Sequence, residues 1–286
     1  MSLTLGGRSF GALPLIMAIV NRTPDSFYDR GATFAREEAM RRVDQVAAEG
    51  ADIVDIGGVK AGPGAEVDVH EEIDRTAAFV AEVRERHPGL LISVDTWRHE
   101  VGLEVCRAGA DLLNDSWGGA DPLLAEVAAG AGAGLVCTHT GGLVPRTRPH
   151  RVEYDDVVAD VIRRTTALAE RAVALGVPRE SVLIDPAHDF GKNTWQSLEV
   201  TRRTGELVAT GWPVLVSLSN KDFIGESLGL PVDQRLNGTL AATALCAWHG
   251  AQVFRAHNVA ETRQVLDMIA VLRNLRPPER VVRGLA

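Results

Sequence analysis

Short apolar runs alternate with amphipathic segments along the whole chain, and this alternation predicts the fold. Eight of the runs end on polar or charged residues, and a stretch with helical periodicity follows each one. These runs cover residues 15–20, 53–54, 91–94, 112–113, 135–137, 182–184, 214–218 and 253–254. Continuous apolar runs are typical of parallel strands that helices bury on both faces, and eight such units close into a (β/α)8 barrel. The sequence therefore predicts an α/β protein, a single TIM-barrel domain over residues 1–286, with the polar strand ends gathered at one rim.

The periodic segments between these strands predict eight helices. They span residues 35–49, 69–86, 99–108, 122–131, 157–175, 194–210, 233–249 and 259–276. Three of the loops that follow strands are long and contain Gly and Pro, namely 21–34, 57–68 and 140–154. Loops of this size at the rim of a barrel are usually functional, because they can close over a substrate and expel water.

Composition and charge narrow the class of protein. Hydrophobic residues make up 45% of the chain and aromatic residues only 5%, so the core is aliphatic, which suits a packed barrel interior. The net charge of -8 argues against a nucleic-acid partner. We expect no membrane partner, since no apolar run approaches the roughly 18 residues of a membrane span. Cys106, Cys137 and Cys246 lie in apolar segments without metal-ligand spacing, which predicts reduced thiols in a cytoplasmic protein.

The last strand ends on Arg255-Ala256-His257, which places two polar side chains on one face, because strand residues two apart point the same way. An arginine and a histidine directed at one point can bind an anion through their hydrogen-bond donors. The alternative is a salt bridge from Arg255 to Asp25 or another carboxylate of the rim. We favour the anion site.

Asp95, Asn114 and Asp185 each follow an apolar strand and would enter a partly dry pocket, where they need hydrogen-bond partners. Two carboxylates and an amide can bind the donor-rich edge of a flat, amino-substituted heterocycle. They can equally form a buried structural network, and the residue types do not separate the two interpretations. Ser219-Asn220-Lys221 also ends a strand, so Lys221 is expected near the site.

Together with Thr23-Pro24-Asp25-Ser26-Phe27 in the first loop and Asp185-Pro186 followed by Phe190-Gly191-Lys192, these residues resemble the dihydropteroate synthases. Those enzymes join 6-hydroxymethyl-7,8-dihydropterin pyrophosphate to p-aminobenzoate and release pyrophosphate. The resemblance extends from about Leu15 to Met268, with the motifs in order. It implies a homodimer formed through helices near the C-terminal end.

The resemblance also implies roles for individual residues. It assigns the pterin to Asp95, Asn114, Asp185 and Lys221, the pyrophosphate anion to Asn21, Arg255 and His257, and the p-aminobenzoate side to Phe190 and Ser219. Asn21 would also hold Mg2+, the cofactor implied for an active enzyme. Lys221, Arg255 and His257 would act catalytically by positioning substrates and stabilising charge on the leaving group, without a covalent nucleophile.

The second long loop departs from the family pattern on the reacting side. The family usually reads Glu-Ser-Thr-Arg-Pro-Gly after Asp55-Ile56-Gly57-Gly58, whereas this chain reads Val59-Lys60-Ala61-Gly62-Pro63-Gly64. Ala61 and Gly62 thus stand where a hydroxyl and a guanidinium are expected, and Lys60 cannot reproduce a bidentate guanidinium. Losing one donor to a developing oxyanion typically costs about 3–4 kcal/mol. We also expect the glycine-rich loop to stay mobile and to bind pyrophosphate poorly.

Further departures surround the pocket. Arg22 replaces a usual Val, Thr138-His139-Thr140 replaces Met-His-Met, Ser217 replaces a Gly, and Asn258 replaces an Asp. The usual Asp-Pro-Gly-Ile-Gly-Phe-Gly-Lys reads Asp185-Pro186-Ala187-His188-Asp189-Phe190-Gly191-Lys192, where Lys192 could simply be an exposed side chain.

These changes predict a dihydropteroate synthase homologue that keeps a pterin or anion pocket but has weak or no synthase activity. An active synthase, in which Arg22 or Lys60 replaces the missing guanidinium, would also fit the motifs. So would a protein like the pterin-binding methyltransferases, which share this barrel, or a non-catalytic ligand-binding protein.

Overall fold

The computed structural model describes residues 2–23, 35–60, 62–147 and 152–283, and it confirms the barrel. Eight parallel strands follow the order β8-β7-β6-β5-β4-β3-β10-β9, and a bridge between Ile184 and Val214 joins the two ends of the sheet. The strands are β3 (Leu15–Asn21), β4 (Ile53–Gly57), β5 (Leu91–Asp95), β6 (Leu112–Asp115), β7 (Gly134–Thr138), β8 (Val182–Asp185), β9 (Leu215–Ser217) and β10 (Val253–Ala256). Each predicted apolar run therefore forms a strand.

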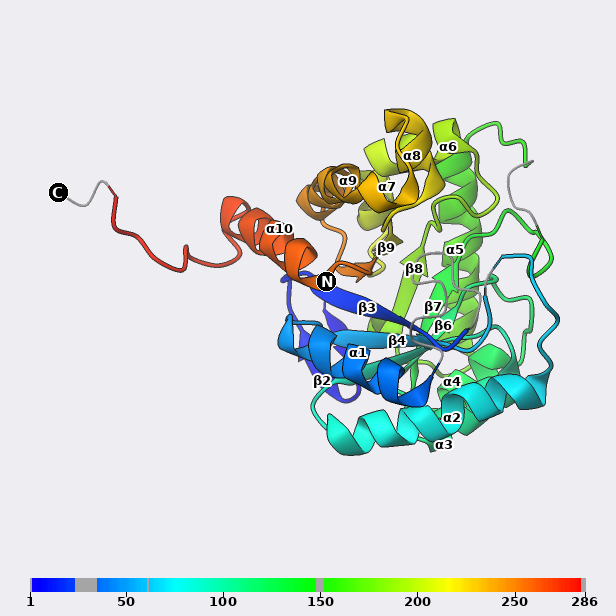
Figure 1. Ribbon diagram of the computed structural model, residues 1–286. Helices are drawn as coiled ribbons and strands as arrows, with labels where there is room; N and C mark the ends of the chain where they lie inside the picture. The colour runs from blue at the N-terminus through cyan, green and yellow to red at the C-terminus, as the bar shows by residue number, and fades with distance from the viewer. Residues whose placement is uncertain (1, 24–34, 61, 148–151, 284–286) are drawn as a thin grey trace.

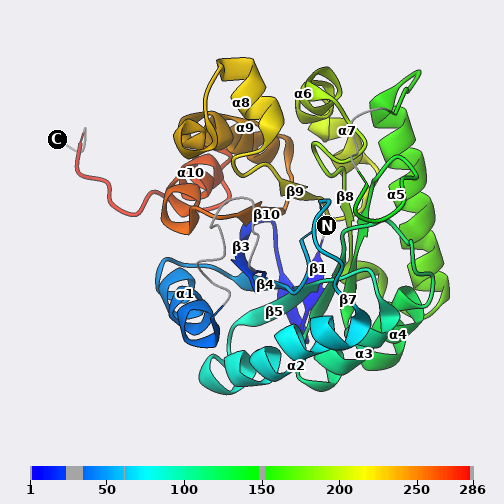
Figure 2. The same ribbon diagram turned by 45° about the vertical axis from the view of Figure 1, so that its right-hand side comes forward.

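Helices surround this barrel, as Figure 1 and Figure 2 show. They are α1 (Arg36–Ala48), α2 (Val69–Arg86), α3 (His99–Arg107), α4 (Leu124–Ala131), α5 (Val157–Ala174), α6 (Thr194–Arg202), α7 (Thr204–Ala209), α8 (Asp222–Leu228), α9 (Leu236–His249) and α10 (Val259–Leu272). The single helix predicted over 194–210 is wrong, because the backbone of Arg203 leaves the helical range and separates α6 from α7. Helix α8, which follows Lys221 directly, was not predicted from the sequence.

A hairpin that was not predicted from the sequence closes the amino-terminal end of the barrel. It pairs β1 (Leu3–Leu5) with β2 (Arg8–Phe10) across Gly6 and Gly7, and both glycines have positive φ angles. Leu3 and Leu5 alternate on one face of β1 and are almost fully buried. Two glycines between short alternating runs are a hairpin signal that the sequence did carry.

The barrel interior consists of an apolar layer with a polar layer above it. The apolar layer contains Leu15, Met17, Ile53, Leu91, Leu112, Val136, Leu183, Leu215 and Val253, packed against Leu3 and Leu5. Strand side chains alternate between faces, so the residue two positions further along points inward as well. On seven of the strands those positions hold Asp55, Ser93, Asn114, Thr138, Asp185, Ser217 and Arg255, while on β3 the position two residues after Met17 holds the apolar Ile19. The alternation of faces thus places a largely polar layer of side chains next to the apolar layer.

Within the described residues, none of the helices has the length and apolar character that crossing a membrane requires. The three cysteines are free thiols, with Cys137 and Cys246 buried.

Candidate functional site

The polar layer is centred on the carboxylate of Asp55, which is fully buried. It accepts hydrogen bonds from Ser93 Oγ at 2.6 Å, Asn114 Nδ2 at 3.2 Å and Arg255 Nε at 2.6 Å. Arg255 also donates from Nη2 to Asp95 Oδ2 at 3.0 Å. Asp95, Asn114 and Arg255, which were predicted to lie at one site, therefore belong to one hydrogen-bond network. Its central residue, Asp55, was not among the predicted site residues.

These contacts correspond to the salt-bridge interpretation of Arg255, with Asp55 and Asp95 as its partners. Asp25 lies outside the described residues. Burial raises the pKa of Asp95 to about 6, although Arg255 opposes this shift. Nearby Asp55 also raises the pKa of Asp95, so two carboxylates share one guanidinium. Binding of an anion by Arg255 remains a prediction.

Asp185 and Lys221 occupy the other side of the site. Asp185 Oδ1 accepts a hydrogen bond from Ala187 N at 2.7 Å, and burial raises the pKa of this carboxyl group, with Lys221 as the main opposing charge. Lys221 donates to the carbonyl of His188, and its ammonium lies 5.1 Å from the centroid of the Phe190 ring. The positive charge of Arg255 also lowers the pKa of both Asp185 and Lys221. The two sides of the site therefore lie close enough to interact electrostatically.

His257 and Asn21 stand next to this network. His257 Nδ1 lies 3.0 Å from Ser219 Oγ, which also accepts a hydrogen bond from the backbone of His257 at 3.2 Å. Burial, together with the charges of Arg255 and Arg42, lowers the pKa of His257 to about 3, so this imidazole is neutral at pH 7. Asn21, Gly57 and Asp95 are successive register partners across β3, β4 and β5.

Gly57 leaves Asn21 and Asp95 at ordinary contact distance from the place that a Cβ would occupy in that row. A Cβ at Gly57 would lie 3.6 Å from Asn21 Oδ1 and 3.8 Å from Asp95 Cβ. Among the described residues, the side chains grouped closely enough to hold a metal ion by themselves are His99, Glu100 and Asp121, outside the barrel. The Mg2+ role that the resemblance gives to Asn21 therefore remains a prediction, and it would need further oxygens from a ligand or water.

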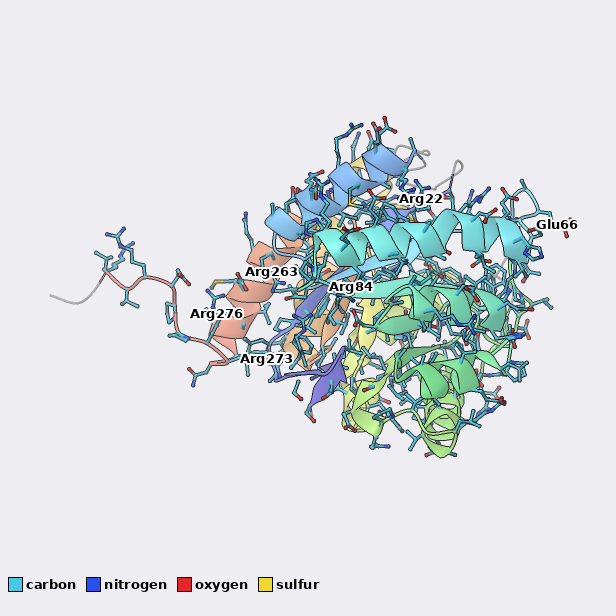
Figure 3. The ribbon with its side chains drawn as sticks, turned by 90° about the horizontal axis from the view of Figure 1, so that it is seen from below. Arg22, Glu66, Arg84, Arg263, Arg273 and Arg276 are labelled. Atoms are coloured by element: carbon cyan, nitrogen blue, oxygen red, sulfur yellow. The ribbon has the colours of Figure 1, made fainter. Side chains whose placement is uncertain are left out.

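Arg22 does not point toward the site. Its Nε donates to the carbonyl of Arg75 at 3.3 Å, and its guanidinium lies 5.0 Å from the centroid of the Phe79 ring on α2. In Figure 3 the label of Arg22 lies between α1, drawn in blue, and α2, drawn in cyan. Burial lowers the pKa of Arg22, and the neighbouring Arg36 and Arg75 add to that effect. The guanidinium thus packs on α2 and is not positioned to replace the one missing from the second loop.

The second loop is fixed at both ends. Val59 and Val67 are buried, Arg75 donates to Gly58 O at 2.8 Å, and Arg98 donates to Val67 O at 2.8 Å. Residues 63–66 are exposed, and Ala61 lies outside the described residues. The sequence did not reveal that arginines of α2 and of the β5–α3 connection hold both ends of the loop. The mobility of the residues between these ends remains a prediction.

An arginine from another loop reaches this segment. Arg146 Nε lies 3.4 Å from Gly62 O, at the edge of hydrogen-bonding distance. Arg146 was not singled out from the sequence, because nothing local connects it with residue 62.

An apolar cluster that was not predicted from the sequence covers part of the rim. Val59, Val67, Trp97 and Trp117 form it, with Leu143 and Phe190 packed against them. Trp117 and Phe190 make an edge-to-face contact, with ring centroids 5.6 Å apart. Phe190, which was predicted to lie on the p-aminobenzoate side, therefore packs partly against other side chains of the protein.

Lys192 is buried, contrary to the interpretation as an exposed side chain. Its Nζ contacts His139 Nδ1 at 2.8 Å and donates to Phe190 O at 2.9 Å and Ala187 O at 3.2 Å. Burial lowers the pKa of Lys192 to about 7. His139 Nε2 in turn lies 2.9 Å from Asp160 Oδ2. Lys192 therefore fastens the β8–α6 loop to the loop after β7.

The same loop contains two residues in the left-handed region, Ala187 at φ 48° and Asp189 at φ 68°, where the resemblance leads one to expect glycines. Asp189 Oδ2 accepts hydrogen bonds from the backbone of Asp222 at 2.7 Å and Phe223 at 3.3 Å. The carboxylate thus caps the start of α8, and this explains why a helix begins there.

Comparisons with known proteins agree with this geometry. A family described as pterin-binding enzymes matches residues 17–257. The chain is 63% identical over 276 residues to a Mycobacterium leprae protein named inactive dihydropteroate synthase 2, covering 95% of each chain. It is 34% identical over 268 residues to the Escherichia coli dihydropteroate synthase, covering 93% of this chain and 94% of that one. A crystal structure of the Yersinia pestis dihydropteroate synthase in a sulfonamide drug complex superimposes with a TM-score of 0.90 at 33% identity, covering 96% of this chain and all of that one.

Proposed function

Because the chain belongs to the family of pterin-binding enzymes and is a diverged homologue of the dihydropteroate synthases, we propose that it binds a pterin and has weak or no synthase activity. One contrast carries the proposal. The polar layer that would hold the heterocycle is present, while the second loop has neither the hydroxyl nor the guanidinium for the leaving group. The name of the Mycobacterium leprae relative supports the same conclusion.

The pterin would be held by groups of complementary hydrogen-bonding character. Carboxylates accept from ring and amino N–H groups, the amide of Asn114 can do both, and the ammonium of Lys221 donates to a ring oxygen or nitrogen. Asp95 and Asp185 lie in buried surroundings that strengthen such hydrogen bonds.

Transfer chemistry needs positive charge where pyrophosphate leaves. Lys221 and Arg255 can supply this charge, but burial lowers the pKa of Lys221, Arg255 is paired with two carboxylates, and the pKa of His257 is lowered to about 3. If Mg2+ binds at Asn21, it would supply part of the missing charge. Losing one preorganised donor costs about 3–4 kcal/mol, or a hundredfold or more in rate.

The alternative of an active synthase has one observation in its favour, the guanidinium of Arg146 beside Gly62. In that case Arg146 would stabilise the leaving group from the loop after β7. An Arg146→Ala substitution would then reduce turnover about a hundredfold.

Steady-state pyrophosphate release from 6-hydroxymethyl-7,8-dihydropterin pyrophosphate and p-aminobenzoate, with Mg2+, tests the proposal. Calorimetric titration with the pterin substrate alone tests binding separately. We expect pterin binding that Asp185→Asn weakens and turnover far below 1 per second, with the Escherichia coli enzyme as the active control. Turnover at typical enzyme rates, about 1 per second or more, would overturn the loss of activity. Absence of pterin binding would overturn the pocket assignment.

We further propose that the protein is a cytoplasmic homodimer. Four large apolar side chains are exposed on α9 and α10, which pack against each other: Leu245, Trp248, Met268 and Leu272. A surface of this kind favours association. Sedimentation should show a dimer that Trp248→Glu converts to a monomer, whereas Trp195→Glu, at an exposed tryptophan on α6, should leave it intact.

A further inference from the structure

The hydroxyl of Thr138 is buried, and it lacks a partner within the part of the chain that the structure describes. Thr138 is the last residue of β7, its exposed fraction is 4%, and Oγ1 has no hydrogen-bond partner among the described residues. A buried hydroxyl without a hydrogen bond destabilises the folded protein. Such a group therefore indicates a ligand that forms the missing hydrogen bond when it binds.

The register of the barrel places Thr138 at the candidate site. Val136, two residues earlier on β7, belongs to the apolar layer of the interior, so Thr138 points inward as well. Its register partner on β8 is Asp185, while Val136 pairs with Leu183 of the same apolar layer. Side chains of register partners in a parallel sheet lie next to each other on one face. Thr138 and Asp185 are therefore adjacent in the polar layer.

The chemistry of a hydroxyl differs from that of its neighbours. A carboxylate such as Asp185 accepts hydrogen bonds, and an ammonium such as Lys221 donates them, whereas a threonine hydroxyl does both. The methionine that the resemblance leads one to expect at this position offers only a weakly accepting sulfur. This chain has thus gained a hydrogen-bonding group beside Asp185.

We propose that Thr138 is a specificity-determining residue, whose hydroxyl forms a hydrogen bond with a ring nitrogen or oxygen of the bound pterin next to the edge held by Asp185. This inference rests on the proposed function. Before ligand binds, the hydroxyl is buried without a partner among the described residues, and the bound pterin would supply that partner.

The test compares variants by calorimetric titration with 6-hydroxymethylpterin. Thr138→Val keeps the shape of the side chain and removes the hydroxyl, and it should weaken binding about tenfold. Thr138→Ser keeps the hydroxyl and should stay within about threefold of the unmodified protein. The matched control is Thr165→Val on α5, because this buried hydroxyl already donates to Val161 O and lies outside the barrel interior. It should leave the affinity unchanged.

The melting temperature provides a second measurement. Without ligand, Thr138→Val should melt at the same temperature as the unmodified protein or higher, because no hydrogen bond of the folded protein is lost. Equal affinity of Thr138→Val and the unmodified protein would reject the role of Thr138 and leave the proposed function standing. An unmodified protein that binds no pterin would reject both.

Discussion

The two sides of the polar layer differ in how their buried groups are paired. Around β4, β5 and β10, Asp55, Asp95 and Arg255 form a network in which each charge contacts an opposite charge of the protein. Around β7 and β8, Thr138 Oγ1 and both ring nitrogens of the buried His188 have no partner among the described residues. The first side is complete without a ligand, whereas the second contains polar groups whose burial is unfavourable. The comparison suggests that the first side supports the fold and that ligand selectivity depends on the second.

We expect the largest effect from a substitution that breaks the network of Asp55, Asp95 and Arg255. Arg255→Ala leaves the carboxylates of Asp55 and Asp95 buried without their cation, and the free energy of unfolding should fall by about 3–5 kcal/mol. Denaturant titration measures this loss. Adding Asp55→Asn should restore part of it, and Arg202→Ala, which breaks an exposed pair with Glu199, should cost no more than about 0.5 kcal/mol. A loss below about 1 kcal/mol for Arg255→Ala would show that the network does not support the fold.

The second prediction rebuilds the missing chemistry on the second loop. Ala61→Thr with Gly62→Arg should raise turnover by up to about a hundredfold, if the new donors act on the leaving group. A side chain fits at Gly62 as far as the described residues are concerned, since among them a Cβ there would approach only Lys60 Cε, at 3.9 Å. Initial rates of pyrophosphate release provide the measurement, and Ala61→Val with Gly62→Leu is the control without donors. No gain over that control would show that the loop does not limit turnover.

The third prediction concerns the unpaired side. His188 is fully buried and stacks on Phe223 with ring centroids 5.5 Å apart. His188→Leu removes two unpaired nitrogens at similar volume and should raise the free energy of unfolding by about 1–3 kcal/mol at pH 7. His139→Leu is the contrasting variant, because it removes partners from Lys192 and Asp160 and should destabilise. Destabilisation by His188→Leu would mean that its ring has a partner in solution.

The smallest effect is a pH dependence of that same substitution. Burial holds the pKa of His188 well below 6.5, and Lys221 and Lys192 lower it further. A histidine whose folded pKa is lowered contributes fully above its unfolded pKa, and this contribution is lost as the pH falls below 6.5. The advantage of His188→Leu over the unmodified protein should therefore grow by about 0.7 kcal/mol between pH 7 and pH 6. A constant difference would indicate a histidine that titrates normally in the folded protein.

The strands and the inward positions of the site could be predicted because both depend on local patterns. Apolar runs mark the strands, and the alternation of faces places Asn114, Asp185 and Arg255 inside the barrel. The partners of Arg255 could not be predicted, because Asp95 and Asp55 lie 160 and 200 positions away in the sequence. Alternation marks Asp55 as inward-facing, but only the barrel register brings it to Arg255.

Burial of Lys192 and the break at Arg203 were missed for a related reason. A lysine after a glycine suggests an exposed turn, and its burial depends on backbone carbonyls and on His139, which a different loop supplies. At Arg203 the guanidinium pairs with its local neighbours Glu199 and Glu206 and also with Asp156, 47 positions away, and this last contact is not visible in the helical periodicity of the segment.

The hairpin at the amino-terminal end has a consequence for the kinetics of ligand exchange. Leu3, Leu5 and the apolar layer close that end of the barrel, and Ser181 Oγ holds the hairpin by donating to Thr4 O at 2.7 Å. A molecule in the polar layer therefore enters and leaves past the loops at the opposite rim. The apolar cluster around Trp97 and Trp117 is built from residues of loops at that rim, so we expect its packing to influence both the association rate and the residence time of a ligand.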